Sequence, residues 1–157
     1  MRHKKVVKRE TNTDPVYNSK LVAKFINNIM IAGKKTAAQK TFYNALVILE
    51  SKGQVPLEAF EKAIQTVGPR VEVKARRVGG ANYQVPAEVR GERKTSLAIR
   101  WIIDAAKARP SAQFHTFAEK LAAELLDVLQ NQGAAIKKRD TVLRMAEANK
   151  AFAHFRW

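Results

Sequence analysis

The chain has 157 residues, with 29 Lys and Arg against 14 Asp and Glu, which gives a formal net charge of +15. Its length and its 46% apolar residues predict one folded domain, and the charge favours a polyanionic partner, nucleic acid ahead of an anionic membrane. It contains no cysteine, no apolar run of about 18 residues and no signal-like apolar segment after its basic start, so we expect a cytoplasmic protein without disulfides.

The N-terminal half of the chain predicts an arm followed by three helices. Residues 1–18 are polar and basic without a period, so we expect an arm that is disordered in the free protein. Apolar residues then recur at helical spacing, with Ser19 as a candidate N-cap and Gly33 as the stop. A second helix is expected over 36–51 and a third over 56–67.

The apolar period changes from 3.6 to 2 over residues 70–90, which predicts a β-hairpin with a loop of about four residues, 79–82. Pro86 cannot donate to a ladder, so its strand is an edge. Because a lone two-stranded ribbon is marginal in water, the hairpin needs support from helices or from a ligand.

Three more helices are expected after the hairpin, over 92–109, 111–133 with Ser111 as N-cap, and 134–149, before a C-terminal tail over 149–157. Trp101 is expected in the core. The predicted fold is therefore mainly α, a six-helix core with a protruding two-stranded β-hairpin arm, in a single domain spanning 1–157.

No pattern favours an enzyme, a metal site or a cofactor. The three histidines lack partners at ligand spacing, and the sequence Gly33–Lys35 fails the phosphate-loop pattern. Two lysines before a helix nevertheless suit a phosphate. Cations at the starts of the fourth and sixth helices oppose the helix dipole unless an anion binds there, which supports contact with a polyanion.

The basic residues of the arm, the first interhelix loop, the hairpin and the start of the fourth helix are the candidate RNA contacts. They are Arg2, Lys4, Lys5, Lys8, Arg9, Lys34, Lys35, Arg70, Lys74, Arg76, Arg77, Arg93 and Lys94. A second group near the C-terminus is a candidate for RNA or protein contact: Lys137, Lys138, Arg139, Arg156 and Trp157.

The aromatic residues near the hairpin tip and in the tail allow two interpretations. Tyr83 either stacks on a base or packs within the protein, and Phe152, Phe155 and Trp157 either stack on bases or tuck back onto the domain. Glu72 and Glu88 reduce the positive charge of the hairpin and are candidates to pair with neighbouring arginines.

Several segments resemble the universal small-subunit ribosomal protein seven family, in its bacterial form. The hairpin carries VEVKARRVGGANYQVPAEVR, the first helix and loop carry DPVYNSKLVAKFINNIMIAGKK, and the later segments are SLAIRWIIDAA and RMAEANKAFAHFRW. The resemblance spans essentially the whole chain in order.

The resemblance implies a ribosomal protein that binds small-subunit ribosomal RNA directly and nucleates assembly of the head, the 3′ major domain. It implies no catalysis. It also implies a position near the decoding region, a contact with small-subunit ribosomal protein eleven, and a hairpin tip close to the exit-site transfer RNA and the messenger RNA path. The tip residues are Gly79, Gly80, Ala81, Asn82 and Tyr83.

Two other classes of protein remain as alternatives. A DNA-bending architectural protein also uses β-ribbon arms with a proline wedge, but Pro86 lies away from the 79–82 tip where a wedge belongs. A basic adaptor at a membrane surface is disfavoured because the cations do not line one amphipathic helix.

Overall fold

The computed structural model describes residues 11–155, which form six α-helices, one 3-10 helix and one antiparallel hairpin. This confirms the mainly α fold with a two-stranded arm. The elements are α1 (Lys20–Ile29), α2 (Lys35–Ser51), α3 (Pro56–Val67), β1 (Val71–Val78), β2 (Ala81–Glu88), α4 (Gly91–Ala108), α5 (Phe117–Leu129), α6 (Ala134–Ala148) and η1 (Lys150–Phe155).

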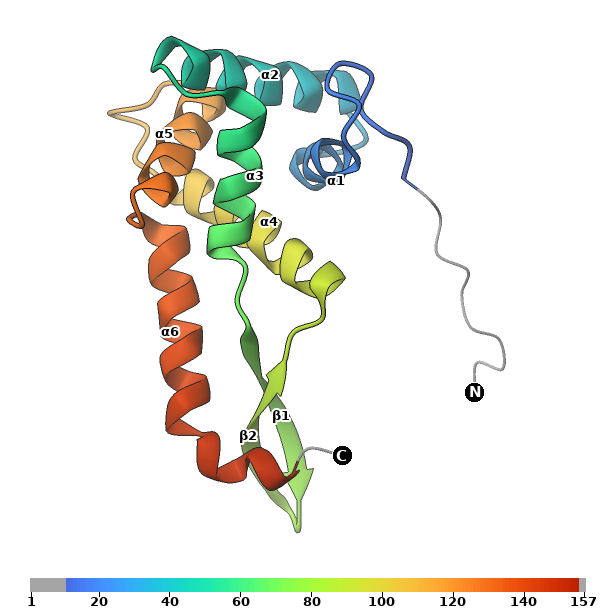
Figure 1. Cartoon of the computed structure of the whole chain (residues 1–157), viewed down its shortest axis with the longest axis vertical. Helices are drawn as coiled ribbons and strands as arrows, with labels where there is room; N and C mark the ends of the chain where they lie inside the picture. The colour runs from blue at the N-terminus through green and yellow to red at the C-terminus, as the bar shows by residue number, and fades with distance from the viewer. Residues whose placement is uncertain (1–10, 156–157) are drawn as a thin grey trace.

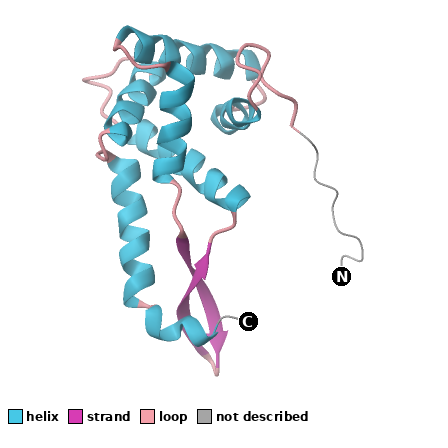
Figure 2. Ribbon diagram, viewed as in Figure 1, coloured by secondary structure: helices cyan, strands magenta, loops and turns pink. Residues whose placement is uncertain are grey.

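Helices α1 to α5 form a helical body, and the hairpin leaves that body between α3 and α4 (Figure 1). Figure 2 shows the two strands extending away from the body alongside α6. Helix α6 packs along β1, and η1 packs against β2, so the hairpin has helical support over much of its length. This arrangement supplies the support that an isolated ribbon lacks.

The core of the body is built around three fully buried phenylalanines, Phe25, Phe42 and Phe60, one each from α1, α2 and α3. Their ring centroids lie 5.0–5.3 Å apart, and two of the three pairs meet edge to face. Such pairs stabilise a core beyond the area they bury. Trp101 is only half-buried, although it packs against this core.

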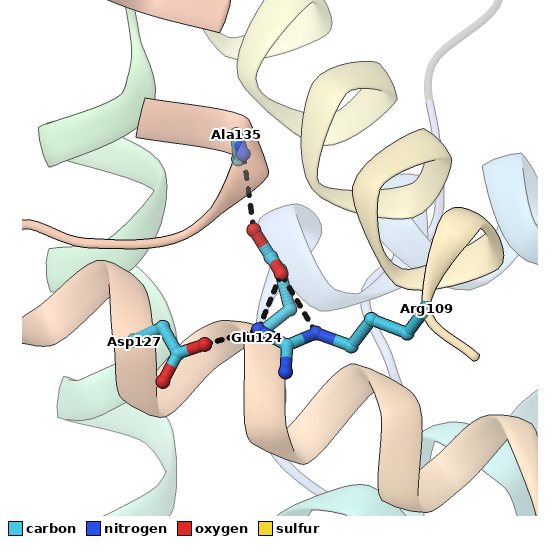
Figure 3. Close-up of polar contacts among 4 residues, drawn as sticks. All are labelled: Arg109, Glu124, Asp127 and Ala135. Atoms are coloured by element: carbon cyan, nitrogen blue, oxygen red, sulfur yellow. Dashed lines mark hydrogen bonds and ion pairs between the residues drawn. The ribbon is translucent and has the colours of Figure 1, made fainter. Parts of the chain in front are cut away.

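A buried carboxylate joins three helices in a way that apolar periodicity does not predict. Glu124 of α5 is 1% exposed and accepts hydrogen bonds from Arg109 Nε and Nη2, at 2.8 and 2.6 Å. Its other oxygen accepts from the backbone N–H of Ala135 at 3.0 Å, in the first turn of α6 (Figure 3). Arg109 also pairs with Asp127. The end of α4 and the start of α6 are thereby tied to α5.

The glycine that precedes α6 fits closely against this network. Gly133 has a φ of 95°, and a Cβ built on it would lie 2.8 Å from Glu124 Oε1. A side chain there would meet both backbone strain and a clash, so the position requires glycine.

Two helix ends differ from the expectations. Helix α1 ends at Ile29 rather than running to Gly33, because the backbone leaves the helical range at Met30, which has a ψ of 131°, and Ala32 and Gly33 then take left-handed φ values of 52° and 74°. Helix α5 begins after Thr116 rather than Ser111. Thr116 and Glu119 form a reciprocal capping box, which satisfies backbone N–H groups that Ser111 would not reach. Ser19 does occupy the N-cap position of α1, without a side-chain cap hydrogen bond.

The expected disordered arm is wrong for residues 14–18, which form a turn against the body, while residues 1–10 lie outside the described part of the chain. Asp14 is 3% exposed and accepts hydrogen bonds from the backbone N–H groups of Val16 and Tyr17, both at 3.1 Å. The Tyr43 hydroxyl of α2 donates to the other Asp14 oxygen at 2.7 Å. Burial raises the pKa of Tyr43 to about 12, and the hydrogen bond and charge of Asp14 add to the effect.

The Asp14–Tyr43 contact predicts a pH dependence at the alkaline end. The folded pKa of Tyr43 lies above its unfolded value of about 10, so this contribution to stability is complete below pH 10. It is lost as the pH rises through about 12. We expect Tyr43→Phe to remove a tyrosinate midpoint near pH 12 from an absorbance titration of the folded protein. A titration unchanged by the substitution would contradict the contact.

Candidate nucleic-acid interface

The hairpin turn is shorter than the expected four residues. Only Gly79 and Gly80 lie outside the ladder, and Ala81 already pairs with Val78. Both glycines have positive φ, 57° and 87°, as a two-residue turn of type I′ requires. This turn matches the twist of the strands and lets the ladder reach almost to the tip.

The strand register places the two central arginines on opposite faces of the ribbon. Arg76 pairs with Tyr83 and Arg77 pairs with Asn82, and both arginines are exposed. Successive strand residues point to opposite faces, so the arm presents a cation on each side near its tip. Pro86 pairs with Val73 in the middle of the ladder, and the tip carries no apolar wedge.

A hollow with a volume of about 530 Å³ lies where the hairpin joins the body, and we call it the root hollow. It brings together cations from β1, from the β2–α4 junction and from α4 that are far apart in the sequence. Its lining consists of Glu72, Lys74, Arg76, Val85, Ala87, Glu88, Arg90 and Arg93. The positive charge of this concave surface suits the backbone of a nucleic acid.

A buried acid lies within these cations. Glu72 is 7% exposed, and both of its oxygens accept hydrogen bonds from Arg93 Nε, at 2.7 and 2.8 Å. Lys74 Nζ lies 3.1 Å from the same carboxylate. The hydrogen bond from Arg93 lowers the pKa of the Glu72 carboxyl below its ordinary value, against the opposing effect of burial. The predicted pairing of Glu72 with an arginine is therefore confirmed.

Two other predicted contacts flank the root hollow. Arg70 is exposed, and its carbonyl accepts from the Val89 N–H at 3.0 Å, where the two chain segments leave the body. Lys94 is half-buried, and its side chain lies over Gly68, where a built Cβ would come within 2.7 Å of it. The stem of Lys94 therefore packs on the end of α3.

The predicted phosphate contacts at the α1–α2 loop lie elsewhere. Lys34 is the N-cap residue of α2, Lys35 is its first residue, and both are exposed. Helix α2 lies at the end of the molecule opposite the hairpin tip (Figure 1). The candidate cations thus form separate groups, which suits contact with more than one segment of a large polyanion.

Of the three candidates on α6, two are exposed and one makes contacts within the protein. Lys137 and Lys138 are exposed. Arg139 instead donates from Nη1 to the Thr66 carbonyl at 2.9 Å and pairs with Asp140, which ties α6 to α3. We therefore assign Arg139 a structural contact. The remaining candidates, Arg2, Lys4, Lys5, Lys8, Arg9, Arg156 and Trp157, lie outside the described residues.

The aromatic residues of the tail pack against the hairpin in this structure. Tyr83 lies with its ring centroid 5.2 Å from those of both Phe152 and Phe155, and the two phenylalanine rings are nearly parallel. Figure 1 shows η1 lying across the hairpin. We call these three residues the aromatic clasp. Of the two interpretations, packing within the protein describes Tyr83, Phe152 and Phe155 in this structure.

The aromatic clasp predicts a local effect of shortening the tail side chains. We expect Phe152→Ala with Phe155→Ala to speed amide hydrogen exchange in β2, because η1 would no longer pack on Tyr83. Exchange in α2, which is remote from the clasp, serves as the internal control. Unchanged exchange in β2 would show that the clasp does not order the hairpin.

Residues 11–155 offer no group of three His, Asp or Glu side chains that could hold a metal ion. Within the same range, no helix is long and apolar enough to cross a membrane.

Comparison with known proteins identifies the family. A model described as ribosomal protein S7p/S5e matches residues 1–150. The small ribosomal subunit protein uS7 of Oleidesulfovibrio alaskensis is 56% identical over 153 residues, covering 97% of this chain and 96% of that protein. The protein of the same name from Nitratiruptor is 55% identical over 159 residues, covering all of both chains. Such proteins are ribosomal structural proteins rather than enzymes. With the hairpin, the helical body and these matches in agreement, the chain belongs to the ribosomal protein S7p/S5e family.

Proposed function

We propose that this protein is a structural constituent of the small ribosomal subunit, where it binds ribosomal RNA directly and nucleates assembly of the head. The whole chain would act as one RNA-binding domain, in the ribosome and in the cytoplasm. The observation that carries the proposal is the cationic hairpin on a helical body, in a chain that belongs to a ribosomal family.

The proposed mechanism is electrostatic and depends on shape. The root hollow, the hairpin edges and the α1–α2 loop each neutralise phosphates, and their separation lets them hold different RNA segments together. The helical body fixes the distances between these groups before RNA arrives. A preformed array of cations reduces the entropy lost on binding and favours a folded RNA junction over a uniform duplex.

The finer placement is also part of the proposal. We place the hairpin tip, 79–83, near the exit-site transfer RNA and the messenger RNA path, and we propose small-subunit ribosomal protein eleven as a neighbour. The exposed tip and its two-residue glycine turn support close approach of backbone to a ligand. No observation favours the DNA-bending alternative, since Pro86 pairs in mid-ladder.

Chemical probing of the isolated 3′ domain of small-subunit ribosomal RNA tests the proposal. We expect this protein alone to protect nucleotides in that domain and to order regions that it does not touch. A protein that protects nothing until other head proteins are added would not be a primary binder, and the assembly role would be withdrawn.

A further inference from the structure

We propose that Glu72, although acidic, promotes RNA binding by positioning Lys74 and Arg93 at the root hollow. This inference rests on the proposed function, because it concerns how the same surface binds RNA. Glu72 is a positioning residue in this scheme and does not itself contact RNA.

Glu72 is buried, whereas the two basic side chains that contact it are exposed. The Glu72 side chain is 9% exposed, whereas the side chains of Lys74 and Arg93 are 50% and 49% exposed. A phosphate approaching Lys74 and Arg93 would therefore meet their charged groups before the Glu72 carboxylate, which is covered behind them. The acid can orient both bases without presenting its own charge to the ligand.

The contact geometry also fixes the direction of the Arg93 guanidinium. Both contacts to Glu72 use Nε, so neither Nη group takes part in them. A guanidinium is planar, and holding one edge aims the other N–H groups in a fixed direction. The fork that suits a phosphate is thereby oriented toward one side before binding.

Glu72 connects two elements whose relative position must stay constant. It lies on β1, and Arg93 lies in the first turns of α4, 21 residues later in the chain. Their contact links the hairpin directly to the helical body. Without it, Lys74 and Arg93 would each be ordered only on binding RNA, and affinity would fall by that entropy.

Substitution by the neutral isostere tests the inference, because simple charge counting predicts the opposite sign. Glu72→Gln raises the net charge by one, so Coulomb attraction alone would tighten RNA binding. We expect instead that the full-length variant binds the 3′ domain RNA roughly tenfold more weakly, about 1.4 kcal/mol. We also expect its logarithmic salt slope to be shallower by about one.

A matched control variant and a mutant cycle separate the effect of positioning on affinity from the effects of net charge and of folding. Glu50→Gln makes the same charge change at an exposed site in the last turn of α2, and we expect it to leave the affinity unchanged. On a Lys74→Gln, Arg93→Gln background, Glu72→Gln is expected to cause no further loss of affinity. A further tenfold loss there would overturn the positioning role.

Thermal unfolding of each variant shows whether binding is measured on folded protein. If Glu72→Gln does not fold, Glu72→Asp keeps the charge but is one methylene shorter, and we expect it to bind more weakly as well. Equal or tighter binding by the folded Glu72 variant overturns the inference while leaving the proposed function intact. Failure of the unmodified protein to prefer the RNA would instead reject the proposed function.

Discussion

Reversing the charge of both hairpin arginines, Arg76→Glu with Arg77→Glu, is expected to weaken RNA binding by more than tenfold while leaving thermal stability nearly unchanged. The two side chains are exposed on opposite faces of the ribbon, so the substitutions replace attraction by repulsion on both sides. For each phosphate that the variant no longer neutralises, the logarithmic salt slope becomes shallower by about 0.7–0.9. Filter binding over a salt series measures both effects.

The control for this variant is a reversal of equal charge on a different surface. Lys52 follows α2 and Lys62 lies on α3, and both are exposed. Lys52→Glu with Lys62→Glu should therefore reduce affinity far less. Equal losses of affinity from the two double reversals would mean that net charge alone governs binding, and a large fall in melting temperature of the hairpin variant would mean that these arginines are structural.

Glu124→Ala is expected to lower the free energy of unfolding by about 3–5 kcal/mol, the usual effect of removing one partner from a buried ion pair. The substitution leaves the Ala135 N–H without its acceptor, and it leaves the Arg109 guanidinium with the partly exposed Asp127 in place of the buried Glu124 carboxylate. Chemical denaturation measures the change. Asp127→Ala is the control, since the Asp127 side chain is 40% exposed and its pairing is screened by water.

A second pair of variants separates the ion pair from the space it fills. Replacing both partners, Glu124→Leu with Arg109→Leu, should restore much of the stability that Glu124→Ala removes, because no charge is then left buried alone. A Glu124→Ala protein as stable as the unmodified chain would show that the network in Figure 3 contributes little to folding.

The sequence predicted those elements whose ends carry strong local signals. Helix α3 has the expected bounds because Pro56 suits a first turn and Gly68-Pro69 cannot continue a helix. The hairpin was found from its period of two. The start of α5 was missed although Thr116 and Glu119 have capping-box spacing, which is a stronger local signal than Ser111 alone.

The remaining differences arise from contacts between distant residues. Asp14 is ordered by Tyr43, 29 residues away, and no local pattern around Asp14 indicates that partner. Glu124 lies within an apolar stripe, and a carboxylate is buried there only when it has a partner. Its burial could therefore not be predicted without knowing that Arg109 binds it. The exposed cations of the hairpin could be predicted from charge and strand period alone.

The same limit applies to the candidate interface. Glu72 was expected to pair with an arginine, but its burial beneath exposed bases depends on how α4 meets the hairpin. Arg139 was grouped with its basic neighbours, whereas the Thr66 carbonyl that it binds lies 73 residues earlier in the chain. The sequence alone does not decide whether Tyr83 and the tail aromatics stack on bases or pack within the protein, because this depends on the path of η1.

Binding of the full-length protein to the isolated 3′ domain of small-subunit ribosomal RNA, titrated with salt and compared with duplex DNA of equal length, tests the central claim most directly. We expect tight binding that prefers the RNA and retains that preference at moderate salt, because the separate cationic groups match a folded junction rather than a uniform rod. Equal affinity for both nucleic acids, falling with salt in the same way, would contradict specific RNA recognition by this protein.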